Sequence, residues 1–459
     1  MPQTIVNRQK PAQKAASRFA PKQAMPVKVA STAAMTKIRP FRAVRYNQEK
    51  IKNLSQVTSP PYDVISAQEQ EAYHSSHPYN FLRILLSKDN PNENKYELAG
   101  KLFRNWQKEE ILIQDPSPSV YFYSQTYNLK GEKKTRFGFM ALLRLGGDKS
   151  KVYVHENTRL AAREDRSKLL EQVKANLSPI FVVFADEKRI ISRIIEKYLP
   201  KEKPLLELQD KESVIHKLWK LDSAEVINSI QSGMEGENIF IADGHHRYEV
   251  ACAYRDELIK KSGSAAGEEN FNYILAYFTN IRQRGLTILP IHRLVRLSSE
   301  LKTRRLKEEL AGNFDLEEVK DADQFFFLLN KAGESEHIIG MYKEKKYWFL
   351  RLKNVKILDK IIIDKSPEYR QLDVSILNYL VLKNGLKLDI DDHEGIIFSP
   401  WPEDLIKQAD QDQKCIAFFL NPVKVQQIMA VALKGEKMPS KSTYFYPKVL
   451  SGLVINKLE

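Results

Sequence analysis

The chain has 459 residues, a formal net charge of +14 and 42% hydrophobic residues. Its length predicts two to four domains, or one large body, because a domain usually holds about 100–200 residues. No apolar run approaches the roughly 18 residues that cross a bilayer, and no secretory signal is visible. The two cysteines, Cys252 and Cys415, argue against a disulfide framework and a cysteine-based zinc site, so we expect a cytoplasmic protein.

Residues 1–36 hold six basic residues and no acidic one, and they show no hydrophobic periodicity. This composition is typical of a transit peptide or of a tail that binds nucleic acid. It is equally typical of a disordered extension or a misassigned start, which we favour because Met35 begins a segment that reads like the start of a domain. The remaining basic excess alternates with glutamates, so we do not expect nucleic acid as a partner.

From residue 37 onward, strands and helices alternate without a fixed repeat. Residues 120–127 and 135–142 are rich in β-formers around a turn at 130–133, and residues 338–352 predict a second hairpin turning at 343–345. These patterns predict an α/β (α+β) class with mixed sheets. We place regions at 37–150, 151–300 and 301–459. Helices are expected at residues 96–110, 163–175, 190–198, 304–311 and 374–383.

The strongest chemical signal is Asp243-Gly244-His245-His246-Arg247. A short apolar run at 239–242 predicts a buried strand, and apolar residues at near-helical spacing predict a helix that begins close to His245. Gly244 permits a sharp turn, the first free N–H groups of the helix bind anions, and the Arg247 fork matches phosphate oxygens. We favour a phosphate or nucleotide site over a metal site, since neighbouring histidines on a helix point about 100° apart, and over a purely structural turn.

Two further segments carry polar side chains. His155, Glu156 and Thr158 end a β-rich run and are followed by a charged stretch at 163–166; a His-Glu pair can supply a general base or a magnesium carboxylate. Near the C-terminus a short loop at 438–448 suits a phosphate or an acidic substrate, although an exposed loop with aromatic anchors would look the same. Its polar members are Lys441, Ser442, Thr443 and Lys448.

Weaker signals are the loop at 58–65, the segment 77–80, and His292-Arg293 after a predicted strand. Each of these patterns is often structural. The sequence contains no phosphate-binding Gly-x-x-x-x-Gly-Lys-Ser/Thr loop, no Gly-x-Gly-x-x-Gly dinucleotide motif and no serine nucleophile elbow.

In this order the segments resemble the bacterial and archaeal family known as "domain of unknown function 1015", over roughly residues 36–459. The matching motifs lie at residues 37–43, 60–63, 155–158 with 163–166, 242–248, 290–293 and 438–448. A shorter resemblance joins residues 243–247 to the Gly-x-x-Arg turn of the partition-protein B and sulfiredoxin-like superfamily, which cradles nucleotide phosphates. It implies a central nucleotide-binding region with N- and C-terminal α/β regions packed on it.

Free-serine kinases of that superfamily carry a similar Asp-Gly-His-His-Arg. The resemblance implies a kinase that uses ATP or ADP with Mg²⁺ to phosphorylate a small hydroxyl compound, with L-serine as the leading acceptor. The alternatives are a nucleotide-gated switch acting on DNA or a protein partner, and a phosphate-ester hydrolase.

Specific roles follow from these expectations. Glu156 is the expected base, with Asp243 as a second carboxylate or magnesium ligand and His246 as a further catalytic residue. The expected nucleotide-binding residues are Gly244, His245, Arg247, Lys441, Ser442, Thr443 and Lys448. The expected substrate-binding residues are His155, Thr158, His292 and Arg293.

Overall fold

The computed structural model describes residues 36–89, 93–146, 150–158, 160–262, 267–333, 335–389 and 395–459. The prediction of a disordered basic extension concerns residues that, apart from Thr36, lie outside these ranges. Within the described part of the chain, no helix combines the length and apolar character that a membrane span requires.

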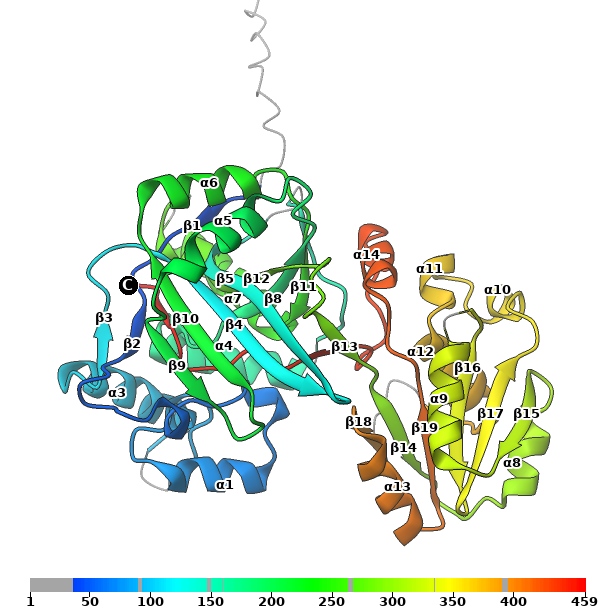
Figure 1. Ribbon diagram of the computed structural model, residues 1–459. Helices are drawn as coiled ribbons and strands as arrows, with labels where there is room; N and C mark the ends of the chain where they lie inside the picture. Colours follow the sequence, from blue (N-terminus) through cyan, green and yellow to red (C-terminus); the bar gives the residue numbers. More distant parts are fainter. Residues whose placement is uncertain are drawn as a thin grey trace, which may run out of the picture. The chain divides into compact units, whose positions relative to one another are not determined.

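The larger sheet has nine strands and is mixed, as expected (Figure 1). Its order is β6-β11-β8-β12-β5-β4-β10-β9, and β1 pairs with the C-terminal end of β5. The pairs β11–β6 and β12–β8 are parallel, whereas β4 and β5 form the predicted antiparallel hairpin. The strands are β1 (Ile38–Arg39), β4 (Val120–Leu129), β5 (Glu132–Arg144), β6 (Val152–Tyr153), β8 (Ile180–Phe184), β9 (Leu206–Gln209), β10 (Ile215–Leu221), β11 (Ile239–Asp243) and β12 (Tyr273–Asn280).

Alternating side chains place apolar residues on both faces of this sheet. Phe122 and Phe139 belong to the core that includes α5 and α6, whereas Tyr121 and Met140 belong to the core that includes α3 and α4. Both faces are therefore covered, which explains why these strands read as nearly continuous apolar runs. The helices are α3 (Lys95–Lys108), α4 (Leu160–Val173), α5 (Ile190–Tyr198), α6 (Ala224–Met234) and α7 (His245–Ser262).

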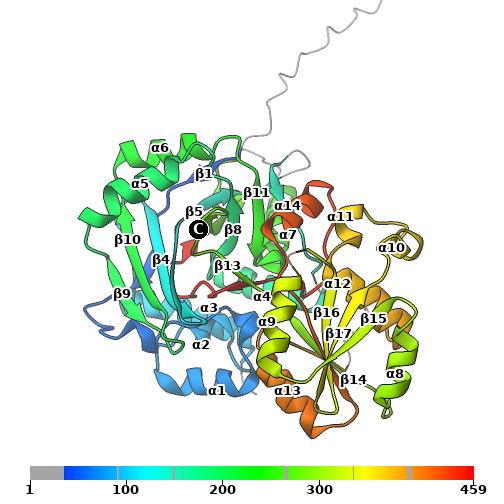
Figure 2. The same ribbon diagram turned by 45° about the vertical axis from the view of Figure 1, so that its right-hand side comes forward.

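The second sheet has six antiparallel strands in the order β15-β17-β16-β19-β14-β18, and its β16–β17 pair is the second predicted hairpin (Figure 2). Phe325 of α9 and Leu405 of α13 share a core with Phe349 and Phe419. Leu306 of α8 belongs to a different core with Leu350. The elements are β14 (His292–Arg296), α8 (Thr303–Leu310), β15 (Phe314–Val319), α9 (Ala322–Ala332), β16 (Ile338–Lys343), β17 (Lys346–Leu352), β18 (Ile396–Ser399), α13 (Pro402–Gln411) and β19 (Cys415–Phe419).

The C-terminal segment returns from the second sheet to the first one. After β19 and α14, β20 pairs with β13, and the final strand β21 pairs with β7. This return brings the loop at 438–448 back to residues that precede it by almost 300 positions. The remaining elements are β2 (Val44–Tyr46), α1 (Ala67–Ser76), α2 (Leu82–Leu85), β3 (Leu112–Gln114), β7 (Ala175–Asn176), β13 (Thr287–Leu289), α10 (Ile357–Ile361), α11 (Pro367–Arg370), α12 (Asp373–Ile376), η5 (Leu377–Gly385), α14 (Val425–Leu433), β20 (Tyr444–Tyr446) and β21 (Asn456–Lys457), with short 3₁₀ turns at Leu54–Gln56, Tyr62–Val64, Leu199–Lys201 and Asn270–Asn272.

The predicted helices are present, with one difference of detail. Residues 374–383 are helical, but α12 continues as the π-helix η5, a distinction of about one residue per turn that apolar periodicity does not reveal.

A boundary near residue 150 would cut through the nine-stranded sheet, because β5 and β12 pair across it. Ala34–Glu459 clusters as one compact unit.

Candidate functional site

A polar cavity of about 110 Å³ opens at the turn between β11 and α7. Distant segments of the chain meet there, including the N-terminal Pro-Pro-Tyr-Asp loop (residues 60–63) and the C-terminal loop at 438–448, which we call the lysine loop. Its lining consists of Tyr62, Asp63, Val64, Glu156, Asn157, Ala242, Asp243, Gly244, His245, His246, Arg247, Ile291, Lys441, Thr443, Tyr444 and Lys448.

The turn has the strand–glycine–helix geometry that the sequence predicted. The pairing of β11 with β8 shifts register between Ile241 and Asp243, so a bulge re-aims Asp243 at the end of the strand. Gly244 follows with φ of +88°, a conformation that favours glycine. A Cβ at this position would lie 2.9 Å from a terminal guanidinium nitrogen of Arg247. The first turn of the 18-residue helix α7 therefore begins at the cavity.

Asp243 is held between two cations. Its Oδ1 accepts a hydrogen bond from Lys448 Nζ, and its Oδ2 accepts one from Arg247 Nη2 at 2.7 Å. Burial by itself would raise the pKa of Asp243, but Lys448 and then Arg247 outweigh it and lower that pKa below its ordinary value. Conversely, burial would lower the pKa of Lys448, but Asp243 and Asp63 outweigh it and raise the pKa. The cluster is thus charged at neutral pH.

Arg247 has capacity left for a ligand. Its Nη1 donates to the carbonyl of Pro179, and its Nε is buried without a hydrogen-bond partner in the described structure. A buried guanidinium N–H without a partner costs free energy unless a ligand oxygen accepts it. This nitrogen is therefore a candidate donor to a phosphate.

Lys448 is positioned by a second buried arginine. Arg136 is fully buried and donates to the carbonyl oxygens of Tyr446 at 3.2 Å and Pro447 at 2.6 Å. Arg136 also donates to Gln125, whose amide nitrogen donates to the carbonyl of Lys448 at 2.8 Å. Hydrogen bonds from Arg136 and Gln125 thus fix the backbone at residues 446–448. The ammonium group of Lys448 is thereby directed at Asp243.

Glu156 links the centre of the chain to the C-terminal loop. Its Oε1 accepts the backbone N–H of Lys441 at 3.0 Å, and Met438 donates its N–H to the carbonyl of His155 at 2.7 Å. The other carboxylate oxygen lies 3.8 Å from His245 Nδ1. Glu156 therefore faces the cavity as a half-exposed carboxylate whose orientation is fixed by the loop.

His155 and His245 form a buried pair behind this carboxylate. Their rings meet edge to face at a centroid distance of 4.6 Å. Burial lowers the pKa of each histidine to about 3, so both are neutral at pH 7. His245 lines the cavity and His155 does not. The expected substrate contact of His155 therefore does not fit its position, since its ring is fully buried.

The other expected substrate residues lie elsewhere. Thr158 donates to Glu249 and lines a neighbouring polar cavity of about 400 Å³. His292 accepts the N–H of Leu420, and Arg293 is buried and donates to the carbonyls of Ile291 and Lys441. Arg293 thus supports the lysine loop from behind instead of facing the cavity.

Among the loop residues that we expect to bind the nucleotide, Lys441, Thr443 and Lys448 line the cavity, whereas Ser442 does not. Ser442 is buried and donates to the carbonyl of Pro439 within its own loop. His246 lines the cavity, and burial lowers its pKa.

Tyr62, Asp63 and Tyr444 also line the cavity, although we did not predict them as site residues from the sequence. The Pro-Pro-Tyr-Asp motif was the available signal for the first two. A loop of this kind is read as structural until the fold shows what it faces.

A magnesium site in this cavity would have to use the carboxylates that line it. Among the described residues, no three His, Cys, Asp or Glu side chains are grouped to hold a metal ion. Asp243 does not fit the role of ligand because both of its oxygens already accept from cations. Asp63 and Glu156 are the cavity carboxylates that fit better, in a site of the kind in which Mg²⁺ is held by one or two carboxylates together with substrate phosphates.

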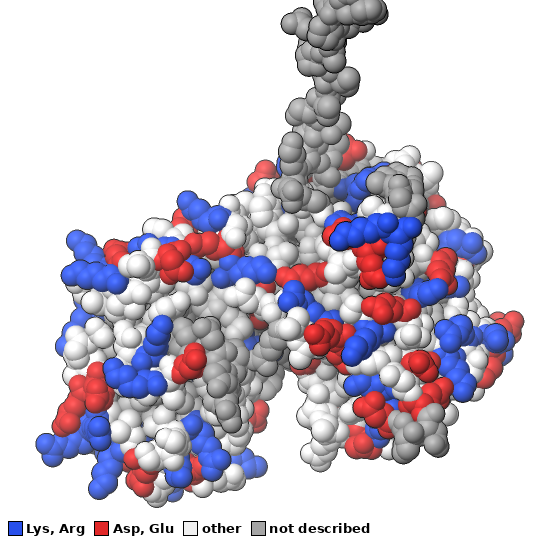
Figure 3. Space-filling view, turned by 180° about the vertical axis from the view of Figure 1, so that it is seen from behind, with Lys and Arg blue, Asp and Glu red and all other residues white. Residues whose placement is uncertain are grey.

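The surface gives no sign of a concentrated basic patch on the face seen in Figure 3, where blue lysines and arginines are interspersed with red acidic residues. Basic and acidic side chains are thus mixed on this face.

Comparison with solved structures returned distant similarities. A free serine kinase mutant in complex with ADP is 11% identical with a TM-score of 0.32, and the match covers 64% of this chain and 84% of that chain. SbnI with a C-terminal truncation, from Staphylococcus aureus, is 13% identical with a TM-score of 0.33, covering 69% and 86%. A conserved hypothetical protein from Pyrococcus furiosus is 14% identical with a TM-score of 0.32, covering 67% and 92%.

A search of curated proteins found no match. A family model, described as "Protein of unknown function (DUF1015)", matches residues 38–375. That span holds the Pro-Pro-Tyr-Asp, His-Glu and Asp-Gly-His-His-Arg motifs, although not the C-terminal lysine loop. The chain therefore belongs to the family of proteins of unknown function named DUF1015.

Proposed function

We propose that this protein is a nucleotide-dependent phosphotransferase that transfers a phosphoryl group from ATP or ADP to the hydroxyl of a small molecule. The observation that carries the proposal is the cavity at the start of α7. There Arg247, Lys441 and Lys448 line the same cavity as the first turn of the helix and the carboxylates Asp63 and Glu156. Phosphoryl transfer needs positive groups for the phosphates and a carboxylate for the attacking hydroxyl, and little else from the protein.

The phosphates would lie at the N-terminus of α7. The helix dipole favours an anion there, and Gly244 allows the backbone to approach it closely. The buried Nε of Arg247 adds a donor. A phosphate oxygen would also share Lys448 with Asp243, which balances the charge of the cluster.

Glu156 is the proposed base. It would accept the proton of the acceptor hydroxyl while the hydroxyl oxygen forms a bond to the terminal phosphorus and the bond to the leaving phosphate oxygen breaks. The products are the phosphate ester, the nucleotide shortened by one phosphate, and one proton. The bond from Lys441 N–H fixes the orientation of Glu156, so the carboxylate is in place before the acceptor arrives.

Mg²⁺, when bound with the nucleotide, would neutralise charge on the phosphate oxygens, and Asp63 is the cavity carboxylate that could hold it while Glu156 acts as the base. L-serine is our leading acceptor, on the resemblance of residues 243–247 to the turn of free-serine kinases.

The test is a product assay. The purified protein is incubated with Mg²⁺, ATP or ADP, and a pool of free amino acids and sugars, and phosphorylated products are identified by mass spectrometry. The Glu156→Gln variant serves as the control for catalysis. We expect O-phosphoserine from the wild type and at least a 100-fold lower rate from the variant, in the range that a general base contributes. Nucleotide binding that yields no product, or only free phosphate, would contradict the kinase.

A further inference from the structure

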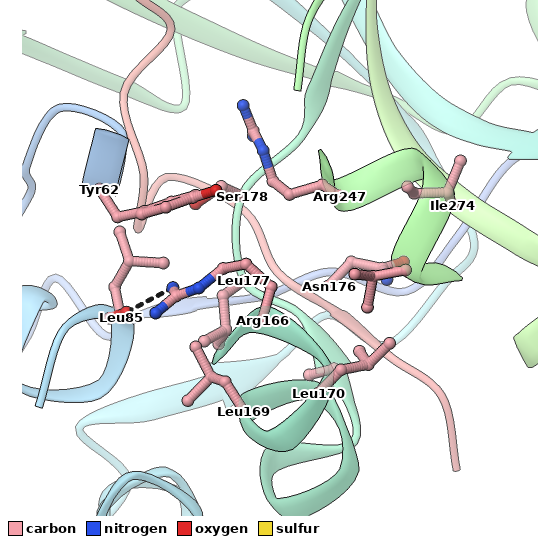
Figure 4. A pocket seen from close by; sticks show the side chains of 12 residues that line it. Tyr62, Leu85, Arg166, Leu169, Leu170, Asn176, Leu177, Ser178, Arg247 and Ile274 are labelled. Atoms are coloured by element: carbon pink, nitrogen blue, oxygen red, sulfur yellow. Dashed lines mark hydrogen bonds between the residues drawn. The ribbon is translucent and has the colours of Figure 1, made fainter. Parts of the chain in front are cut away.

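A second, smaller cavity lies beside the phosphate cavity and shares two of its walls. Tyr62 and Arg247 line both cavities. The second cavity is mainly apolar, with leucines from α2 and α4 on one side and residues of α7 and β12 on the other, as Figure 4 shows. A ligand held by Arg247 in the first cavity can therefore extend directly into the second.

One wall is formed by Tyr62 and Arg166, a stacked pair that the phosphate chemistry leaves unexplained and that we call the Tyr62–Arg166 platform. The guanidinium carbon of Arg166 lies 4.1 Å from the centroid of the Tyr62 ring. Arg166 also donates to Asp165 and, at 2.9 Å, to the carbonyl of Leu85, so its plane is fixed by the protein (Figure 4). These residues come from the Pro-Pro-Tyr-Asp motif and the Glu-Asp-Arg motif, which are about 100 residues apart in the sequence.

The size and polarity of the cavity suit a heterocyclic base. Its volume of about 60 Å³ corresponds to roughly four to six water molecules at about 10–15 Å³ each, close to what a flat two-ring base displaces. Asn176 lies at one edge, where its Oδ1 already accepts from Leu275 N and from Asn456 Nδ2. Its NH₂ group is thus the end that an acceptor nitrogen of a ligand can use.

We infer that the second cavity binds the base of the nucleotide whose phosphates lie in the first cavity. The base packs between the Tyr62–Arg166 platform and the apolar side chains of α7 and β12. Arg247 stands at the junction and contacts the phosphate end. This inference rests on the proposed function and adds the part of the site that selects a nucleotide over other polyphosphates.

Isothermal titration calorimetry with ADP and with inorganic tripolyphosphate tests the inference. Leu170 lines the second cavity but not the first, and it is only half-buried on α4, so Leu170→Trp fills the cavity with little risk to the fold. Leu160→Trp on the same helix is the matched control, because Leu160 is 63% exposed and lines neither cavity. Circular dichroism confirms that both variants are folded.

We expect the wild type to bind ADP at least tenfold more tightly than tripolyphosphate. Leu170→Trp should weaken ADP at least tenfold and leave tripolyphosphate unchanged, and Leu160→Trp should change neither. Equal effects of Leu170→Trp on both ligands, or no effect on ADP, would overturn the base site while leaving the phosphate site standing. A wild type that binds neither ligand would instead remove the proposed function, and the base site with it.

Discussion

Replacement of Arg247 by alanine is the most informative single change. The side chain supplies one buried Nε that has no partner among the described residues, one bond to Asp243 at 2.7 Å and one to the carbonyl of Pro179. A hydrogen bond to a charged group contributes about 1.5–3 kcal/mol, and each 1.4 kcal/mol is about a factor of ten in affinity. Arg247→Ala should therefore weaken tripolyphosphate and ADP binding by about 10- to 150-fold.

The same change also affects stability, which must be measured separately. Asp243 keeps Lys448 as a partner, so the carboxylate is not left unpaired, but the carbonyl of Pro179 loses its donor. We expect the free energy of unfolding to fall by about 1–3 kcal/mol, the cost of an unsatisfied buried polar group. Urea unfolding of the variant measures this loss and fixes the conditions under which binding is compared.

Arg255→Ala is the matched control, because Arg255 lies on the same helix α7 but donates to the carbonyl of Gly146, away from the cavity. It should leave the affinity for both ligands within about twofold of the wild type, an energy difference below about 0.5 kcal/mol. Unchanged affinity in Arg247→Ala, with the variant folded, would refute the phosphate assignment. A loss of the same size in Arg255→Ala would show that the effect is not local to the cavity.

Four further predictions follow. Gly244→Ala should destabilise the protein by about 1–2 kcal/mol, because φ at this position is +88°, and should weaken tripolyphosphate binding in calorimetry; full affinity would contradict a close backbone approach. Arg136→Met should lower the free energy of unfolding by about 2–4 kcal/mol and reduce tripolyphosphate affinity through Lys448, with Arg136→Lys partly restoring both. Glu156→Gln should leave ADP affinity within about threefold while product formation is lost; equal losses of both would argue for a binding role. His155 has a folded pKa of about 3 against an ordinary 6.5, so stability is full above pH 6.5 and falls as the pH drops towards 3, and His155→Gln should make that slope shallower by about 1.4 kcal/mol per pH unit in urea titrations.

The local elements were readable from the sequence because they depend on neighbours along the chain. The turn from β11 into α7 followed from an apolar run, a glycine and helical spacing, and the hairpins β4–β5 and β16–β17 appeared at the predicted turns. A phosphate-binding role for residues 243–247 could be predicted for the same reason. The residue types, their order and the turn are all local.

Other decisions belonged to the tertiary structure. Whether a polar residue faces the cavity depends on contacts across hundreds of positions, which no local pattern encodes. Arg293 looked like a substrate ligand but supports the loop at Lys441, whereas Tyr62 and Asp63 looked structural and line the cavity. The domain boundary that we predicted near residue 150 also depends on long-range contacts, because β5 pairs with β12 across it.

The sequence by itself thus determined the mixed α/β class, the motif that starts α7 and the chemical types available for a phosphate site. Only the tertiary structure decided which of those side chains meet. The return of the C-terminal segment brings Lys448 to Asp243, and the pair is held in place by Arg136 and Gln125. The physical reason is that burial and long-range pairing, not the identity of a residue, set whether a charge is free for a ligand or is used to hold the fold together.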